Sequence, residues 1–240
     1  MPKDHKDGHG RDAARSVYQI KVTLLHSHPP IWRRLRVESN VTLDQLHHTL
    51  QVVMGWTNSH LHGFRLPQPD QRGPRRRLLP IESANEKATR LGNLLRRPKD
   101  WFVYDYDFGD SWEHEVLLEH VLPCSSPARF PMVLAGRGAC PPEDVGGIPG
   151  YYHFLEAIKD PKHPEHEDMM EWAGKDFDPA AFDVQEINRA FHGGWGPGHP
   201  FRTRVRTGAP TDSGEERKDD RIARVRPRAL VLLVAALLLG

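Results

Sequence analysis

Alternation of apolar and polar residues predicts two strands near the start of the sequence. Over residues 17–25, apolar side chains recur at every second position, which is typical of a half-buried strand. Pro29 and Pro30 interrupt the pattern, and alternation resumes over residues 31–38. We expect these two segments to form an antiparallel hairpin.

A helix is predicted next, over residues 42–54. Thr42 and Gln45 have the spacing of a capping box, in which the threonine oxygen accepts from the amide three residues later. Leucines and valines follow at helical spacing, and Gly55 supplies the left-handed residue that ends many helices. The apolar stripe of this helix should pack on the sheet.

The remaining pattern completes an α+β fold. Phe108, Gly109 and Asp110 separate two strongly alternating segments, which is typical of a tight hairpin. After residue 150 the apolar period becomes helical. We therefore expect an antiparallel sheet of about five strands packed against one main helix, with a short helical C-terminal segment. The expected strands are 17–25, 31–38, 61–66, 101–107 and 112–122, residues 132–135 are a weaker candidate, 67–80 form a loop, and the late helices are 151–159, 164–172 and 183–191.

The two ends of the sequence lack this periodicity. We expect residues 1–15 to be a disordered leader, 16–195 the folded domain, and 196–240 a disordered basic tail with a short apolar end. The apolar run 229–239 is shorter than the roughly 20 residues that a membrane helix needs, so no integral membrane span is expected. Without a secretory signal, a cytoplasmic location is expected, with Cys124 and Cys140 as free thiols.

Charge is unevenly distributed along the chain, although the formal net charge is only +1. The first hundred residues hold 18 basic and 9 acidic groups, and the second hundred hold 6 and 18. Either the first half presents a basic surface to a polyanion, or the two halves neutralise one another within one domain. We favour mutual neutralisation, because both segments are strongly patterned and should share one sheet.

The predicted hairpin brings carboxylates together. Such a cluster needs partners, because like charges on one sheet repel and raise carboxylate pKa values. Arg34 and Arg36 are the expected partners in a salt-bridged face; a cation site and an unidentified partner surface are the alternatives. The carboxylates are Asp105, Asp107, Glu113, Glu115 and Glu119.

Three histidines are candidate metal ligands. His60 and His62 lie two residues apart on a predicted strand and so share a face, which lets both imidazoles reach one ion. His114 lies on an apolar strand face, where a hydrogen-bonded core role is the more common one. No motif requires a cofactor, although these histidines make a divalent metal ion a candidate.

The loop at residues 138–147 concentrates a thiol, two carboxylates and three glycines around a diproline. We interpret it as a structural turn between the sheet and the helices, or as a binding or catalytic site built on Cys140, Glu143 and Asp144. A nucleophilic Cys140 would need a lowered pKa and an adjacent base. We also expect this loop and the strand histidines to converge on one concave site.

Five blocks of the sequence resemble the plasmid pRiA4b ORF-3-like family. They occur in the expected order over roughly residues 17–192, which makes the resemblance specific. The blocks are PPIWRRLRV (29–37), VMGWTNSHLHGF (53–64), YDYDFGDSWEHEVLLE (104–119), GACPPEDVGG (138–147) and HPEHEDMMEWAGKDFDPAAFD (163–183).

The resemblance implies a single compact α+β domain, widespread in bacteria and archaea and often encoded near plasmids and insertion elements, without an established function. Some relatives are labelled transposon resolvases. The chemistry does not support that label here, because neither a serine nucleophile within an arginine cluster nor an Arg-His-Arg-Tyr constellation is recognisable.

Two function hypotheses follow. The first is a non-enzymatic binding module associated with mobile genetic elements, with nucleic acid or another protein as its partner. Its candidate contacts to nucleic acid, where tryptophan stacks on bases and arginine meets phosphate, are Trp32, Arg34, Arg36, Arg75, Arg76 and Arg77. The second is a metal-assisted enzyme that uses the strand histidines and the loop around Cys140.

Overall fold

The structure, a computed structural model, describes residues 16–67, 78–124, 129–174 and 176–192. The expected leader, the expected tail and the candidate contacts Arg75, Arg76 and Arg77 lie outside the described residues.

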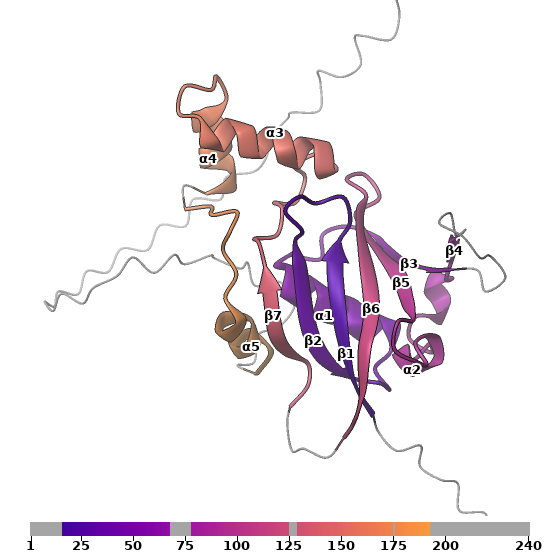
Figure 1. Ribbon diagram of the computed structural model, residues 1–240. Coiled ribbons are helices and arrows are strands. Elements are labelled where there is room, and N and C mark those ends of the chain that lie inside the picture. The colour runs from indigo at the N-terminus through magenta and orange to yellow at the C-terminus, as the bar shows by residue number, and fades with distance from the viewer. Residues whose placement is uncertain (1–15, 68–77, 125–128, 175, 193–240) are drawn as a thin grey trace, which may run out of the picture. The chain divides into compact units, whose positions relative to one another are not determined.

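One antiparallel sheet dominates the described chain (Figure 1), with strand order β4-β3-β5-β6-β1-β2-β7. The two predicted hairpins form, since β1 pairs with β2 and β5 pairs with β6. In the strand order they occupy the four positions between β3 and β7. The strands are β1 (Ser16–Leu24), β2 (Trp32–Glu38), β3 (His62–Pro67), β4 (Leu78–Pro80), β5 (Trp101–Tyr106), β6 (Trp112–Pro123) and β7 (Met132–Arg137).

Helix α1 (Leu43–Met54) crosses behind the sheet in Figure 1 and covers one of its faces. The predicted capping box is present, since Thr42 accepts from the Gln45 amide and the Gln45 side chain accepts from the Thr42 amide. Gly55 ends the helix in the left-handed conformation, with φ 86°. The leucine stripe of α1 packs on alternate residues of the strands, and this layer is the hydrophobic core.

The expected count of about five strands and one main helix is wrong. The sheet has seven strands in the described residues, and several short helices accompany it. Strand β4 lies in the segment expected to be a loop, and β7 forms over residues that were only a weaker strand candidate. The further helices are η1 (Ser83–Asn85), α2 (Leu91–Leu94), α3 (Gly147–Lys159), α4 (His166–Ala173) and α5 (Val184–His192).

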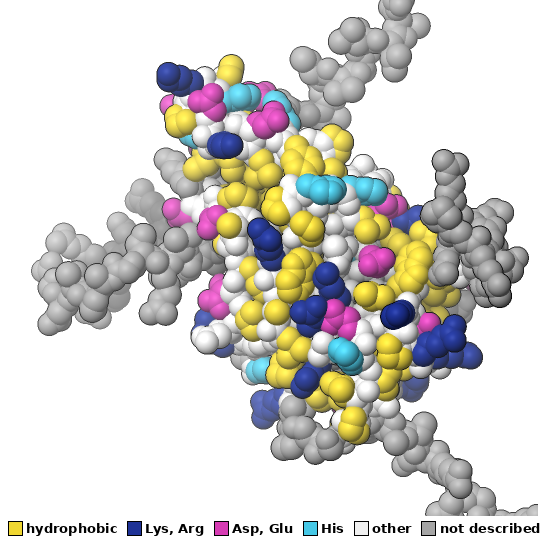
Figure 2. Space-filling model, viewed as in Figure 1, with side chains coloured by type: hydrophobic (Ala, Val, Ile, Leu, Met, Phe, Trp, Pro, Cys, Tyr) yellow, Lys and Arg dark blue, Asp and Glu magenta, His cyan; other side chains and the backbone are white. Residues whose placement is uncertain are grey.

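The sheet face opposite α1 carries basic, acidic and apolar side chains side by side (Figure 2). Arg34 forms a two-pronged bond to Glu119 at 2.6 and 2.7 Å. Arg65 does the same to Asp105 at 2.5 and 2.6 Å and also contacts Glu113. Basic residues of the first half thus neutralise acidic residues of the second half on this face, with Arg65 as a partner that the sequence did not indicate.

Helix α5 lies along β7, the outer strand on one side of the sheet (Figure 1). The Asn188 side chain accepts from the Val133 amide at 2.8 Å and donates to the Val133 carbonyl at 2.9 Å. One side chain therefore bonds both backbone groups of a residue in an edge strand.

Candidate functional site

Three chain segments meet where β3 begins and β5 ends: the stretch between α1 and β3, the β5–β6 turn, and the loop before α3. The Glu143 carboxylate joins them, because one oxygen accepts from the Thr57 amide at 3.2 Å and from the Thr57 hydroxyl at 2.5 Å. The other oxygen accepts from the Tyr106 hydroxyl at 2.5 Å. Burial and the bond to Glu143 raise the pKa of Tyr106, so its hydroxyl stays protonated and donates.

Two further bonds fix the loop that carries Glu143. The Trp56 indole donates to the Pro141 carbonyl at 3.2 Å, and the Gly146 amide donates to the Asp110 carboxylate at 3.1 Å. The loop is thus tied to both of the other segments, which gives its side chains defined positions.

His60 lies between two carboxylates from the other two segments. Its Nδ1 is 3.6 Å from Asp107 Oδ2, and its Nε2 is 3.3 Å from Asp144 Oδ1. The Nε2 atom is buried and has no hydrogen-bond partner among the described residues. Asp144 is largely exposed, with 71% of its side chain accessible, so the cluster opens to solvent on that side.

Asp107 is oriented by the turn that it begins. Its backbone has φ 55°, and its Oδ1 accepts from the Gly109 amide at 2.9 Å and the Asp110 amide at 3.4 Å. Asparagine and aspartate tolerate this left-handed backbone because they bond their own turn. The second carboxylate oxygen, Oδ2, is left facing His60.

This cluster has the composition of a metal site. One ligand atom each from His60, Asp107 and Asp144 lies within 4.8 Å of the other two, and no other such group is found in the described parts of the chain. Ligands of a transition metal lie about 2.0–2.2 Å from the ion, so two of them are at most about 4 Å apart. The two carboxylates face different nitrogens of the His60 ring and one ion would use one of these nitrogens, so binding requires the ring or a carboxylate to move.

His62 contacts a different set of groups. Its Nε2 lies 2.9 Å from Glu86 Oε2, and its ring stacks on that of His47 with centroids 3.5 Å apart. The other Glu86 oxygen is buried without a partner among the described residues. Burial, and then the charge of His62, lower the pKa of His47 to about 4, and its ring bonds Tyr104 and Asn58.

His114 lies in the interior, and Cys140 is partly buried against the core. His114 is fully buried, and burial lowers its pKa to about 4. Burial raises the pKa of the Cys140 thiol, although the charge of the buried Arg33 acts in the opposite direction. A thiol with a raised pKa is a poor nucleophile at neutral pH. Of the candidate residues, the structure brings His60, Glu143 and Asp144 to one place and gives His62, His114 and Cys140 other surroundings.

Asp107 and Tyr106 are not among the site residues predicted from the sequence. Asp107 belongs to the carboxylate cluster for which a salt-bridged strand face is expected and a cation site is an alternative, yet its position two residues before Gly109 is typical of an aspartate that folds back on its own turn. Tyr106 gave no signal, because alternation alone marks it as a core residue. His60 lies just before β3, not within it.

The described candidate contacts to nucleic acid, Trp32, Arg34 and Arg36, lie on the open sheet face. The Trp32 ring has the Lys21 ammonium at 5.2 Å and the Arg34 guanidinium at 5.1 Å from its centroid. Arg34 is already bonded to Glu119, whereas the Arg36 Nε is buried and has no partner among the described residues. The basic groups of this face are therefore only partly available for contacts to nucleic acid.

The chain is similar over most of its length to two proteins whose functions are not known. The chain is 40% identical over 186 residues to the uncharacterized protein y4hQ of Sinorhizobium fredii, which covers 73% of this chain and 90% of that protein. It is also similar to the crystal structure of the protein of unknown function MM3350 from Methanosarcina mazei Go1, with 37% identity, a TM-score of 0.64, and coverage of 72% of this chain and 97% of that one.

None of the described helices has the length and apolar character needed to cross a membrane.

The family model of the plasmid pRiA4b ORF-3-like proteins matches residues 16–186, which span the described sheet and nearly all of its helices. The ordered blocks of the sequence and this match lead to the same conclusion: the chain belongs to the plasmid pRiA4b ORF-3-like family.

Proposed function

We propose that this domain binds a divalent cation at His60, Asp107 and Asp144 and carries out metal-assisted chemistry on an oxygen-bearing substrate. The observation that supports the proposal is the convergence of one imidazole and two carboxylates, from three separate segments, within 4.8 Å. A mixed nitrogen and oxygen ligand set suits Zn²⁺ or Mn²⁺.

The small number of protein ligands favours a reactive role over a structural one. Structural zinc sites are closed by four protein ligands, whereas catalytic sites keep a position open for water or substrate. With Asp144 on the solvent side, the open positions would face the solvent. A bound cation there would polarise a substrate oxygen or lower the pKa of a bound water molecule.

Cation binding by matched variants tests this proposal. The full chain, without an affinity tag and freed of metal by dialysis, is titrated with Zn²⁺ and with Mn²⁺ in a calorimeter. We expect His60→Gln and Asp144→Asn to weaken the same cation event at least about tenfold, because each removes one ligand. Asparagine tolerates the left-handed backbone of Asp144, at φ 62°, so the second variant should keep the fold.

The control is His153→Gln, because His153 also pairs with a carboxylate, at 2.5 Å from Glu165, but lies outside the cluster. The chain has 15 histidines, so the difference between variants decides and the bare stoichiometry does not. If His60→Gln and Asp144→Asn bind both cations as the unchanged chain does, the cluster is an ion pair of His60 with two carboxylates and the proposal fails.

A binding module for nucleic acid, the role that would fit an association with mobile elements, is our second candidate. It is favoured by Trp32 on the open sheet face, with cations of Lys21 and Arg34 beside its ring. Any such binding should be electrostatic and should weaken steeply with salt. Retention of labelled single-stranded DNA across a salt series tests it, and absence of retention at low salt removes this candidate in favour of a protein partner or none.

A further inference from the structure

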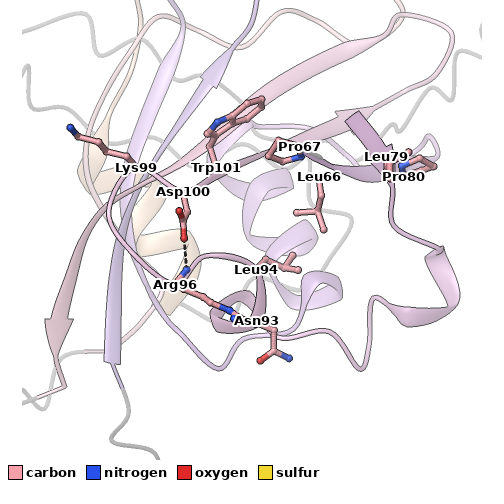
Figure 3. Close-up of a pocket in the computed structure, with 10 residues that line it drawn as sticks. All are labelled: Leu66, Pro67, Leu79, Pro80, Asn93, Leu94, Arg96, Lys99, Asp100 and Trp101. Atoms are coloured by element: carbon pink, nitrogen blue, oxygen red, sulfur yellow. Dashed lines mark hydrogen bonds between the residues drawn. The ribbon is translucent and has the colours of Figure 1, made fainter. Parts of the chain in front are cut away.

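We propose a second binding site, at the opposite end of β3 and β5 from the His60 cluster, for a small organic anion with an apolar body. The site is a cavity of about 700 Å³ (Figure 3). Strand β3 runs from His62 to Pro67, about 17 Å at the usual rise per residue, so the two sites are separate. Cavities of 300–1,000 Å³ are the size that small molecules occupy in proteins.

The walls of the cavity are apolar and come from separate elements. Figure 3 shows Leu66 of β3 and Leu94 of α2 on facing sides, with Trp101 at the start of β5 above them. Both leucines are only partly buried and pack against the core, and Leu79 of β4 is 41% exposed at the rim. An apolar ligand body would take this surface out of water, which is the main source of affinity in such sites.

The acidic residue of the cavity does not neutralise its cation. Asp100 accepts from the backbone amides of Arg96 at 2.8 Å and Arg97 at 3.0 Å, the first of which is the dashed line in Figure 3. Burial alone would raise the pKa of Asp100, but these amide bonds, together with the Arg97 guanidinium 3.5 Å away, outweigh it and lower the pKa. The carboxylate is thus bound by its own turn and by Arg97.

Arg96 supplies the cation. Figure 3 shows its side chain extending from the Asp100 turn along the floor of the cavity toward Asn93, whereas the Lys99 ammonium is directed away from the two leucines. The Arg96 guanidinium makes no hydrogen bond or ion pair with another described residue. A guanidinium binds carboxylates, sulfonates and phosphates through two parallel hydrogen bonds, so one oxyanion beside an apolar body complements this cavity.

Two fluorescent probes of nearly the same shape test the inference. The probes are 8-anilinonaphthalene-1-sulfonate, which carries an anionic group, and the neutral N-phenyl-1-naphthylamine. We expect Arg96→Gln to weaken sulfonate binding about tenfold and to leave the neutral probe unchanged, because only the sulfonate uses the guanidinium. Trp101→Ser should weaken both probes, because it removes apolar wall.

Lys87→Gln is the control: it also removes one positive charge, from an exposed side chain that does not line the cavity. The sulfonate probe must also raise the midpoint of thermal unfolding, since a ligand of the native state stabilises it. Removal of cations by chelation should leave probe binding unchanged, which separates this site from the one proposed at His60.

Three results would overturn the inference. They are equal losses of sulfonate binding in Arg96→Gln and Lys87→Gln, which would reduce the effect to net charge; unchanged binding of both probes in Trp101→Ser; and a lowered unfolding midpoint, which would place the probe on unfolded chains.

Discussion

His114 is a titratable residue in a fully buried position. Its Nδ1 lies 3.3 Å from the Tyr104 carbonyl, its Nε2 has no partner in the described structure, and the Trp56 ring meets it edge-on. Charging this ring inside the core would require removing a cation from water, so the folded protein keeps it neutral. The stability of the fold therefore depends on His114 remaining neutral.

Acid should destabilise the protein partly through His114. An unfolded histidine binds a proton below about pH 6.5, but folded His114 resists protonation until about pH 4. The contribution of neutral His114 to the unfolding free energy is complete above pH 6.5. It is lost as the pH falls toward 4. His114→Met should therefore remove about 2 kcal/mol of the loss in unfolding free energy between pH 7 and pH 5, as measured by urea unfolding at both pH values.

The exposed His120 provides the comparison for this experiment, since His120→Gln changes a histidine of the same strand outside the core. A His114→Met protein whose stability falls between pH 7 and pH 5 as steeply as that of the unchanged protein would contradict the assignment.

The sequence indicated some residues of the candidate site but not their partners. Glu143 and Asp144 stood out because a glycine-bounded loop gives no packing reason for polar side chains. The match of Asp144 with His60 depends on where that loop is anchored, and the anchors are Tyr106 and Thr57 on other segments. Such contacts follow from tertiary structure, which periodicity along the chain does not encode.

The turn from the loop into α3 depends on two glycines that pack closely against the backbone of other residues. Gly147 has φ 67°, and a Cβ there would lie 2.4 Å from the Asp110 carbonyl oxygen. A Cβ at Gly150 would lie 1.9 Å from the Val145 carbonyl oxygen. The loop that carries Asp144 can therefore enter α3 at this angle only with glycine at these positions.

Gly150→Ala should displace this loop. We expect a loss of at least about 2 kcal/mol in unfolding free energy, because the clash is with backbone that cannot rotate away, together with weaker cation binding at His60. Calorimetric unfolding and the cation titration measure the two effects.

Gly174→Ala is the control for this change. Gly174 has φ 92° and ψ 131° with nothing within 4 Å of an added Cβ, so alanine there should cost about 1–3 kcal/mol of backbone strain and spare the cation site. An unchanged cation affinity in Gly150→Ala would show that the Val145 carbonyl yields without displacing the loop.

Strands with strong alternation could be predicted from the sequence, and β4 could not. Strands β1, β2, β5 and β6 form close to the predicted bounds, because each alternates over six residues or more. Strand β4 has three residues, one of them Pro80, and pairs with residues 65–67 of β3 through the backbone. A strand that short carries no period, so only its pairing partner reveals it.

At the scale of the molecule, the sheet brings the basic and the acidic parts of the chain together. Arg34 and Glu119 are 85 positions apart in sequence, and Arg65 and Asp105 are 40 apart, yet each pair is joined on one sheet face. The basic first hundred residues and the acidic second hundred supply neighbouring strands, so the segregation along the chain becomes interleaving in space. The preference for mutual neutralisation agrees with these pairs.

A chain limited to residues 16–195 should unfold as cooperatively as the full chain. All strands and helices of the described structure lie between Ser16 and His192, and the sequence outside the predicted domain lacks apolar periodicity. Scanning calorimetry should give midpoints within about 3 °C of one another, which corresponds to about 1 kcal/mol for a domain of this size. A shortened chain that aggregates or melts far earlier would show that the boundaries are wrong.

The bond of Asn188 to Val133 affects how this molecule behaves beside copies of itself. An outer strand with free amides and carbonyls can recruit a strand from another chain, and repeated recruitment produces fibrils. At Val133 both groups are occupied by a side chain of the same molecule. On the other margin β4 offers three residues, and Pro80 has no amide proton to donate. Growth of the sheet by templated strand addition is thus hindered on both margins, which should keep crowded copies from polymerising.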